Sequence, residues 1–199
     1  NEWHYKNVRS RLMGIPTLIK TLTADNDTSL SFVDGTSDVV LDSTYDEYMF
    51  VFTDINPATD GGILGFQVNA TDDAGGGYDT SQITSTFFTS EQAEAGDPDA
   101  RIAYKTGSDL ANGTAFQQLN RSAGNGSDES SAGVLHLFSP SSTTYVKHFY
   151  ARVNSYFYAD YTMDNFIAGY INDTTAIDEI QFKMSSGNFD GVIQMYGIS

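Results

Sequence analysis

Apolar and polar residues alternate along most of the chain with a period of two, which is the period of a β-strand. Between residues 45 and 55, the side chains of Tyr48, Phe50 and Phe52 fall on one face. The same spacing recurs over residues 177–184 near the C-terminus. The pattern predicts strands, because an amphipathic helix needs a period of 3.6.

Eleven segments follow this pattern, and clusters of Gly, Asn, Asp and Ser typical of turns separate them. The predicted strands are residues 18–23, 29–33, 45–55, 63–70, 83–89, 102–106, 133–138, 145–154, 165–171, 177–184 and 192–198. Many short strands at fairly even spacing predict an all-β fold, namely a jelly-roll-like antiparallel β-sandwich.

Some of the predicted strands are apolar on both faces. In the segment 133–138, Leu135 and Leu137 on one face oppose Val134 and Phe138 on the other. An antiparallel sheet that meets water on one side keeps that side polar, so a second apolar face needs a cover. We therefore expect a homo-oligomer. The alternative is that the long Ser- and Asp-rich loops cover these residues.

The composition limits the partners. The 199 residues carry 26 acidic and 10 basic side chains, for a net charge of −16, and they suffice for one domain. Such a charge repels nucleic acid and anionic membranes, so we expect neither as a partner. A saline habitat or selection for solubility would also explain it. The absence of cysteine excludes disulfides and thiolate catalysis.

The first residues differ from the rest, and we interpret 1–16 as an N-terminal arm and 17–199 as the β-sandwich domain. The arm holds the only Trp and several basic residues before the break at Gly14 and Pro16. It is predicted either to dock on a neighbouring subunit or to pack as a strap on its own domain. The residues expected to attach it are Trp3, Tyr5, Lys6, Arg9 and Arg11.

No catalytic constellation emerges from the sequence, so we expect no enzyme and no cofactor. His136 and His148 fall in predicted strands joined by a loop at 140–144, and they lack a third metal ligand. We expect them to be half-buried and hydrogen-bonded to neighbours. Acidic residues near strand starts, such as Glu47 and Asp178, are interpreted as solvated strand edges.

Two other kinds of ligand deserve a prediction. Asp- and Asn-containing loops near Gly suit Ca²⁺, although none has the twelve-residue loop pattern. The weak calcium candidates are Asp54, Asn56, Asp60, Asp72 and Asp73. Exposed tyrosines stack on sugar rings, with core packing as the alternative. The glycan-facing candidates are Tyr78, Tyr156, Tyr158 and Tyr161.

Four phrases resemble virion structural proteins of tailed bacteriophages, especially marine phages and cyanophages. They are DSTYDEY at 42–48, LHLFSPSSTTYVKHF at 135–149, AIDEIQFKMSSGN at 176–188 and IQMYGI at 193–198. The resemblance extends over most of 17–199. It implies a β-sandwich module on the particle surface and carries over no catalytic residue.

The expected function is therefore that of a phage virion structural protein. The resemblance and the short arm favour a capsid decoration (cement) protein or head-fibre subunit, attached to other virion proteins through the arm and through oligomer contacts. The alternative is the receptor- or carbohydrate-binding tip of a tail fibre, since jelly rolls often serve as lectin domains.

Overall fold

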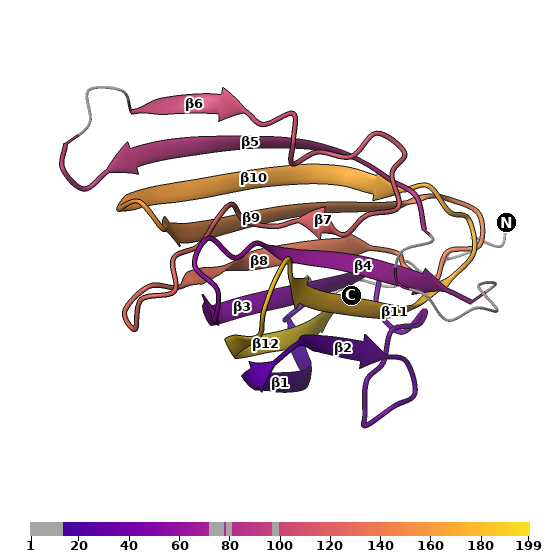
Figure 1. Cartoon of the computed structure of the whole chain (residues 1–199). Coiled ribbons are helices and arrows are strands. Elements are labelled where there is room, and N and C mark those ends of the chain that lie inside the picture. Colours follow the sequence, from indigo (N-terminus) through magenta and orange to yellow (C-terminus); the bar gives the residue numbers. More distant parts are fainter. Residues whose placement is uncertain (1–13, 72–77, 79–80, 97–99) are drawn as a thin grey trace, which may run out of the picture.

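The computed structural model describes residues 14–71, 78, 81–96 and 100–199, and these form a sandwich of two antiparallel β-sheets (Figure 1). Twelve strands build it: β1 (Thr17–Asp27), β2 (Ser29–Val33), β3 (Glu47–Pro57), β4 (Leu64–Ala70), β5 (Ile83–Ala93), β6 (Arg101–Tyr104), β7 (Gln117–Gln118), β8 (Ser131–Phe138), β9 (Lys147–Phe157), β10 (Tyr161–Ile171), β11 (Ile177–Met184) and β12 (Phe189–Ile198).

The two sheets differ in size. The large sheet has the strand order β1-β12-β3-β8-β9-β10-β5-β6, and the small sheet has the order β2-β11-β4-β7. The chain alternates between the two sheets from β1 to β5 and again from β10 to β12, so that β2, β4 and β11 lie in the small sheet and the strands before and after them in the large one. Figure 1 shows β4, β11 and β2 lying across the large sheet, while β5 and β6 extend beyond them. The predicted jelly-roll-like antiparallel β-sandwich is confirmed.

The core lies between the small sheet and one face of the large sheet, called the inner face here. Phe182 on β11 is fully buried, and its ring centroid lies 5.3 Å from those of Phe50 and Phe52 on β3. Phe66 on β4 meets Phe149 on β9 edge to face, with centroids 5.1 Å apart. Burying each such ring contributes about 1.5–3 kcal/mol, so these contacts hold the two sheets together.

All eleven predicted strands are present; residues 29–33 and 177–184 have the predicted bounds, and the other nine differ at one or both ends. The twelfth, β7, has no apolar pattern, because it consists of the glutamines Gln117 and Gln118. Gln117 is buried and its side-chain amide donates a hydrogen bond to the Ser108 carbonyl at 3.0 Å. Side-chain hydrogen bonding therefore fixes this edge of the small sheet. Within the described residues, no helix has the length and apolarity to cross a membrane.

One lysine is fully buried at the end of the sandwich. Lys147 is the first residue of β9 and points to the inner face, with no exposed surface. Its ammonium group donates hydrogen bonds to the carbonyls of Asp173 (3.0 Å) and Thr175. It thereby ties the connection between β10 and β11 to the large sheet.

Candidate functional site: the open face of the large sheet

The face of the large sheet that points away from the small sheet is called the open face here. Along β9, residues alternate between buried and exposed, so Tyr150, Arg152 and Asn154 point to this face. The strand registers place the outward residues of β3, β8, β10 and β5 in rows beside them. The apolar and aromatic members are Met49, Val51, Phe88, Val134, His136, Phe138, Tyr150, Phe166 and Tyr170.

Aromatic side chains contact one another across these strands. Phe88 on β5 stacks on Phe166 on β10, with centroids 4.8 Å apart and planes 3° from parallel. Tyr150 on β9 lies between two β8 residues, 4.5 Å from the His136 ring and 5.6 Å from the Phe138 ring. Cross-strand pairs of this kind stabilise a sheet and leave their ring faces available for contact.

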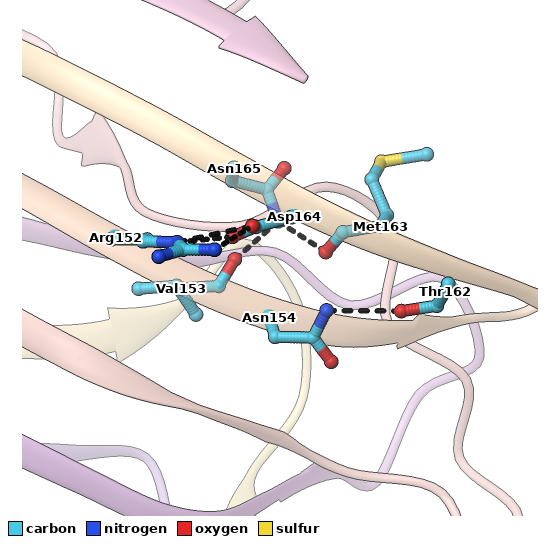
Figure 2. Close-up of polar contacts among 7 residues, drawn as sticks. All are labelled: Arg152, Val153, Asn154, Thr162, Met163, Asp164 and Asn165. Atoms are coloured by element: carbon cyan, nitrogen blue, oxygen red, sulfur yellow. Dashed lines mark hydrogen bonds and ion pairs between the residues drawn. The ribbon is translucent and has the colours of Figure 1, made fainter. Parts of the chain in front are cut away.

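The few charged groups on this face are paired. Figure 2 shows the ion pair between Arg152 and Asp164 on the neighbouring strand. The Nε atom of Arg152 donates to Oδ2 of Asp164 at 3.0 Å, and a terminal nitrogen donates to the same oxygen at 2.6 Å. This hydrogen bond raises the pKa of Arg152. The guanidinium carbon also lies 5.1 Å from the centre of the Phe166 ring. A second pair joins Glu47 to His136.

The open face is therefore close to neutral. Among the exposed and outward residues of β3, β8, β9, β10 and β5, the charged side chains other than histidine are one base, Arg152, and three acids, Glu47, Asp54 at the bulge of β3, and Asp164, which gives a net charge of −2. The whole chain carries −16. The charge of the protein thus lies almost entirely elsewhere.

No further strand or helix of the described residues covers this face, because the twelve strands form only the two sheets. Phe88 is 39% exposed and Tyr150 is 45% exposed. Five strands of up to 11 residues, about 4.8 Å apart and rising about 3.3 Å per residue, span roughly 24 Å by 36 Å, or about 860 Å². A typical interface buries about 800 Å² on each partner.

The predicted half-buried, hydrogen-bonded environment is correct for His136 and wrong for His148, which is exposed. His136 and His148 lie on the paired strands β8 and β9, and His136 is half-buried with Glu47 as its partner. His148 is exposed and faces Tyr170, with ring centroids 6.1 Å apart. Within the described ranges, no three His, Asp or Glu side chains gather as they would around a metal ion.

The interpretation of Glu47 and Asp178 as solvated edges is wrong. Both are half-buried, and Glu47 is bound to His136. In the described part of the chain, the buried Oδ1 atom of Asp178 has no hydrogen-bond partner. Burial, together with the nearby charge of Glu179, raises the pKa of Asp178.

Three of the four predicted glycan-facing tyrosines lie at the hairpin that joins β9 and β10, but Tyr156 points to the open face and Tyr161 to the inner side of the sheet. Tyr158 is 51% exposed, and its ring centroid lies 4.5 Å from that of Phe157. Tyr161 meets Phe157 edge to face at 6.1 Å. The hydroxyl of Tyr156 donates to Asp160 at 3.0 Å, which raises its pKa to about 12.

Tyr78 lies apart from this cluster. Its hydroxyl neighbours Ser31 and Glu179 on the small sheet, and burial raises its pKa to about 12. Asn56, one of the calcium candidates, is engaged within the protein, because its amide nitrogen donates a hydrogen bond to the Gly126 carbonyl at 2.9 Å. Asp54 and Asp60 are exposed. The other candidates, Asp72 and Asp73, lie outside the described residues, and calcium binding stays a prediction.

The attachment residues of the predicted arm, Trp3, Tyr5, Lys6, Arg9 and Arg11, also lie outside the described residues. Residues 14–16 have no secondary structure, and β1 begins at Thr17. Docking through the arm therefore stays a prediction.

Phe88, Arg152 and Phe166, which characterise the open face, are not among the site residues predicted from the sequence. The sequence does show that several strands carry an outward apolar residue. Whether these residues form one surface depends on the register between the strands, which the sequence does not provide.

Comparison of the chain with protein-family models, with curated proteins and with solved structures found no match.

Proposed function

We propose that the chain is a structural subunit of a phage virion, and that copies of it associate through the open face of the large sheet. The observation that carries the association is the open face itself. Its five central strands span about 860 Å² with the polar positions included, and the aromatic side chains Phe88 and Tyr150 are exposed on it. Exposed aromatic side chains that adjoin one another on a protein surface often mark an interaction site.

Charge favours a second copy as the occupant of this face. Two copies that each carry −16 repel one another, and the repulsion is smallest where the facing surfaces carry little charge. Over β3, β8, β9, β10 and β5, the open face carries −2. A two-fold arrangement would stack the two large sheets about 10 Å apart, so that Phe88, Tyr150 and Phe166 of each copy become buried.

The virion role rests on the sequence resemblance described above. Two of its phrases, at 135–149 and 193–198, cover parts of β8, β9 and β12 in the large sheet. These phrases therefore belong to the scaffold that presents the open face. A capsid decoration protein or head-fibre subunit needs such a rigid module in many copies, with an acidic exterior that keeps particles apart in solution.

The virion role is tested on phage particles whose genome encodes this chain. Immunogold labelling of purified particles, with antibodies against the recombinant protein, is expected to decorate the head at regular positions. Quantitative mass spectrometry of the same particles should give a fixed ratio to the major shell protein. Particles without label and without peptides of the chain would contradict the virion role.

A second candidate function is carbohydrate binding, as in a fibre tip. The observation that favours it is the grouping of Phe157, Tyr158 and Tyr161 at one hairpin, with Tyr158 half-exposed. Aromatic faces of this kind stack on sugar rings. A glycan array probed with the recombinant protein tests it, and an array with no binder would contradict it.

A further inference from the structure

A pocket of about 410 Å³ opens next to the tyrosine hairpin, on the inner side of the large sheet. It lies at the end of β5, β6 and β10, where the large sheet extends beyond the small one (Figure 1). Its lining includes Glu91, Arg101, Lys105, Arg121, Phe157 and Tyr161. A pocket of this volume falls in the range of small-molecule sites.

Basic residues are concentrated in this pocket to an unusual degree. The described residues of this acidic chain include seven Lys and Arg side chains, and three of them line the pocket. They come from different parts of the fold: Arg101 from β6, Lys105 from the turn after it, and Arg121 from the connection between β7 and β8. Their convergence is a property of the fold and not of a basic run in the sequence.

One acid offsets part of this charge. Glu91 forms ion pairs with Lys105 and with Arg101, the latter at 3.3 Å, and its other contact is the Thr89 hydroxyl at 2.6 Å. Burial raises the pKa of Glu91, but the hydrogen bonds from Lys105 and Thr89 outweigh it, and the net effect is a lowered pKa. Three bases and one ionised acid leave the pocket with a net charge of +2.

Arg121 is the base that remains available. It is half-buried, and among the described residues its guanidinium has neither an ion pair nor a hydrogen bond. Its nitrogens are not among the buried side-chain atoms that lack a partner in the described part of the chain, so they are open to the solvent in the pocket. An anion that enters the pocket can therefore reach this guanidinium directly.

The backbone around Arg121 is held firmly in place. The amide of Ala123 donates to the Gly62 carbonyl at 2.9 Å, and the amide of Tyr158 donates to the Ser122 carbonyl at 3.1 Å. Ser122 itself has a φ of 41°, an uncommon value for a residue other than glycine. These contacts fix the position from which Arg121 reaches the pocket, beside Phe157 and Tyr161.

We propose that this pocket binds the carboxylate of an acidic sugar, with Arg121 as the principal anion ligand. The planar guanidinium matches a carboxylate through two parallel hydrogen bonds, and Lys105 and Arg101 add positive charge nearby. The rings of Phe157 and Tyr161 supply an apolar wall for the sugar ring. The anion is inferred from the pocket alone, whereas the choice of a sugar rests on the second candidate function.

The test uses isothermal titration calorimetry of the full chain with D-glucuronate, N-acetylneuraminate and, as the neutral counterpart, D-glucose. The acidic sugars are expected to bind and glucose to bind at least tenfold more weakly. Arg121→Gln is expected to weaken binding of the acidic sugars at least tenfold. Lys20→Gln removes the same charge from β1, at the opposite edge of the large sheet, and should bind as the parent protein does.

Chemical-shift mapping of the unsubstituted protein keeps the proposal testable if Arg121→Gln does not fold. Addition of glucuronate should move the amide signals around Arg121, Phe157 and Tyr161. Shifts confined to another surface, or no binding of either acid, would overturn the proposal. Equal binding of glucose and glucuronate would also overturn it and leave the carbohydrate-binding function standing. If Lys20→Gln lost as much affinity as Arg121→Gln, the acidic sugars would be held by non-specific charge attraction, and the assignment of Arg121 would be overturned.

Discussion

The two faces of the large sheet are built from the same strands and from the same kinds of side chain, yet only one of them is covered. On the inner face, Phe50, Phe52 and Phe149 pack against the small sheet and are almost wholly buried. On the open face, Phe88 and Tyr150 keep 39% and 45% of their surface exposed. What distinguishes the faces is the presence of a second layer.

This difference separates folding from assembly. The inner face gains its free energy within one copy, because the small sheet is part of the same chain. The open face gains little within one copy, since its rings touch only their neighbours in the same sheet. Substitutions on the two faces should therefore affect different properties, and the following experiments examine that separation.

The largest effect is expected for Phe182→Ala, which removes the ring at the centre of the aromatic core. Cavity formation and lost burial should reduce the free energy of unfolding by about 3–5 kcal/mol. Phe166→Ala on the open face is the matched control and should cost less than about 1 kcal/mol in a monomer. Urea unfolding measures both, and equal losses would contradict the separation of the faces.

Lys147→Ala should have the next largest effect. It removes the buried donor to the carbonyls of Asp173 and Thr175, together with the aliphatic part of the side chain. We expect a loss of about 2–3 kcal/mol. His148, the next residue, points to the open face, and His148→Ala should stay within about 0.5 kcal/mol of the parent protein. Differential scanning calorimetry distinguishes the two, and a reversed order would place Lys147 outside the structural core.

Arg152→Ala addresses the paired charges on the open face. The side chain of Arg152 is 66% exposed, so water screens its contact with Asp164. We therefore expect the substitution to change the stability of the monomer very little. A larger loss, measured by urea unfolding at low and high salt, would show that the pair belongs to the folding free energy and not to the assembly surface.

The smallest effect is expected for Asp178→Asn. Burial raises the folded-state pKa of Asp178 above its ordinary value of 3.8, so the folded protein holds this proton more tightly than the unfolded chain does. Its contribution to stability is therefore lost as the pH rises through the interval between those two pKa values. The variant should be slightly more stable at neutral pH, and the gain should disappear below pH 3.8. An equal gain in stability at neutral pH and below pH 3.8 would contradict this explanation.

The sequence predicts the strands well because alternation is a local property. The segment 177–184 is β11 without a change of bounds, and Ser29–Val33 is β2. β7 escapes prediction because the side-chain hydrogen bonds of Gln117, and not an apolar pattern, hold it in place.

The candidate sites are less accessible to sequence reasoning. Tyr156, Tyr158 and Tyr161 are neighbours in the chain, so their grouping could be anticipated. Phe88 and Phe166 lie 78 positions apart, and Arg101 and Arg121 come from different segments of the chain. Only the pairing of the strands and the path of the connections bring such residues together, and neither can be derived from spacing alone.

The central claim is that copies of the chain associate through the open face, and sedimentation equilibrium of the parent protein and of Tyr150→Glu tests it most directly. The substitution places a charge at the centre of the aromatic surface without touching the core. We expect the parent protein to associate as the concentration rises, the variant to remain monomeric, and the two to unfold at nearly the same temperature. A parent protein that stays monomeric, or a variant that associates equally well, would contradict the claim.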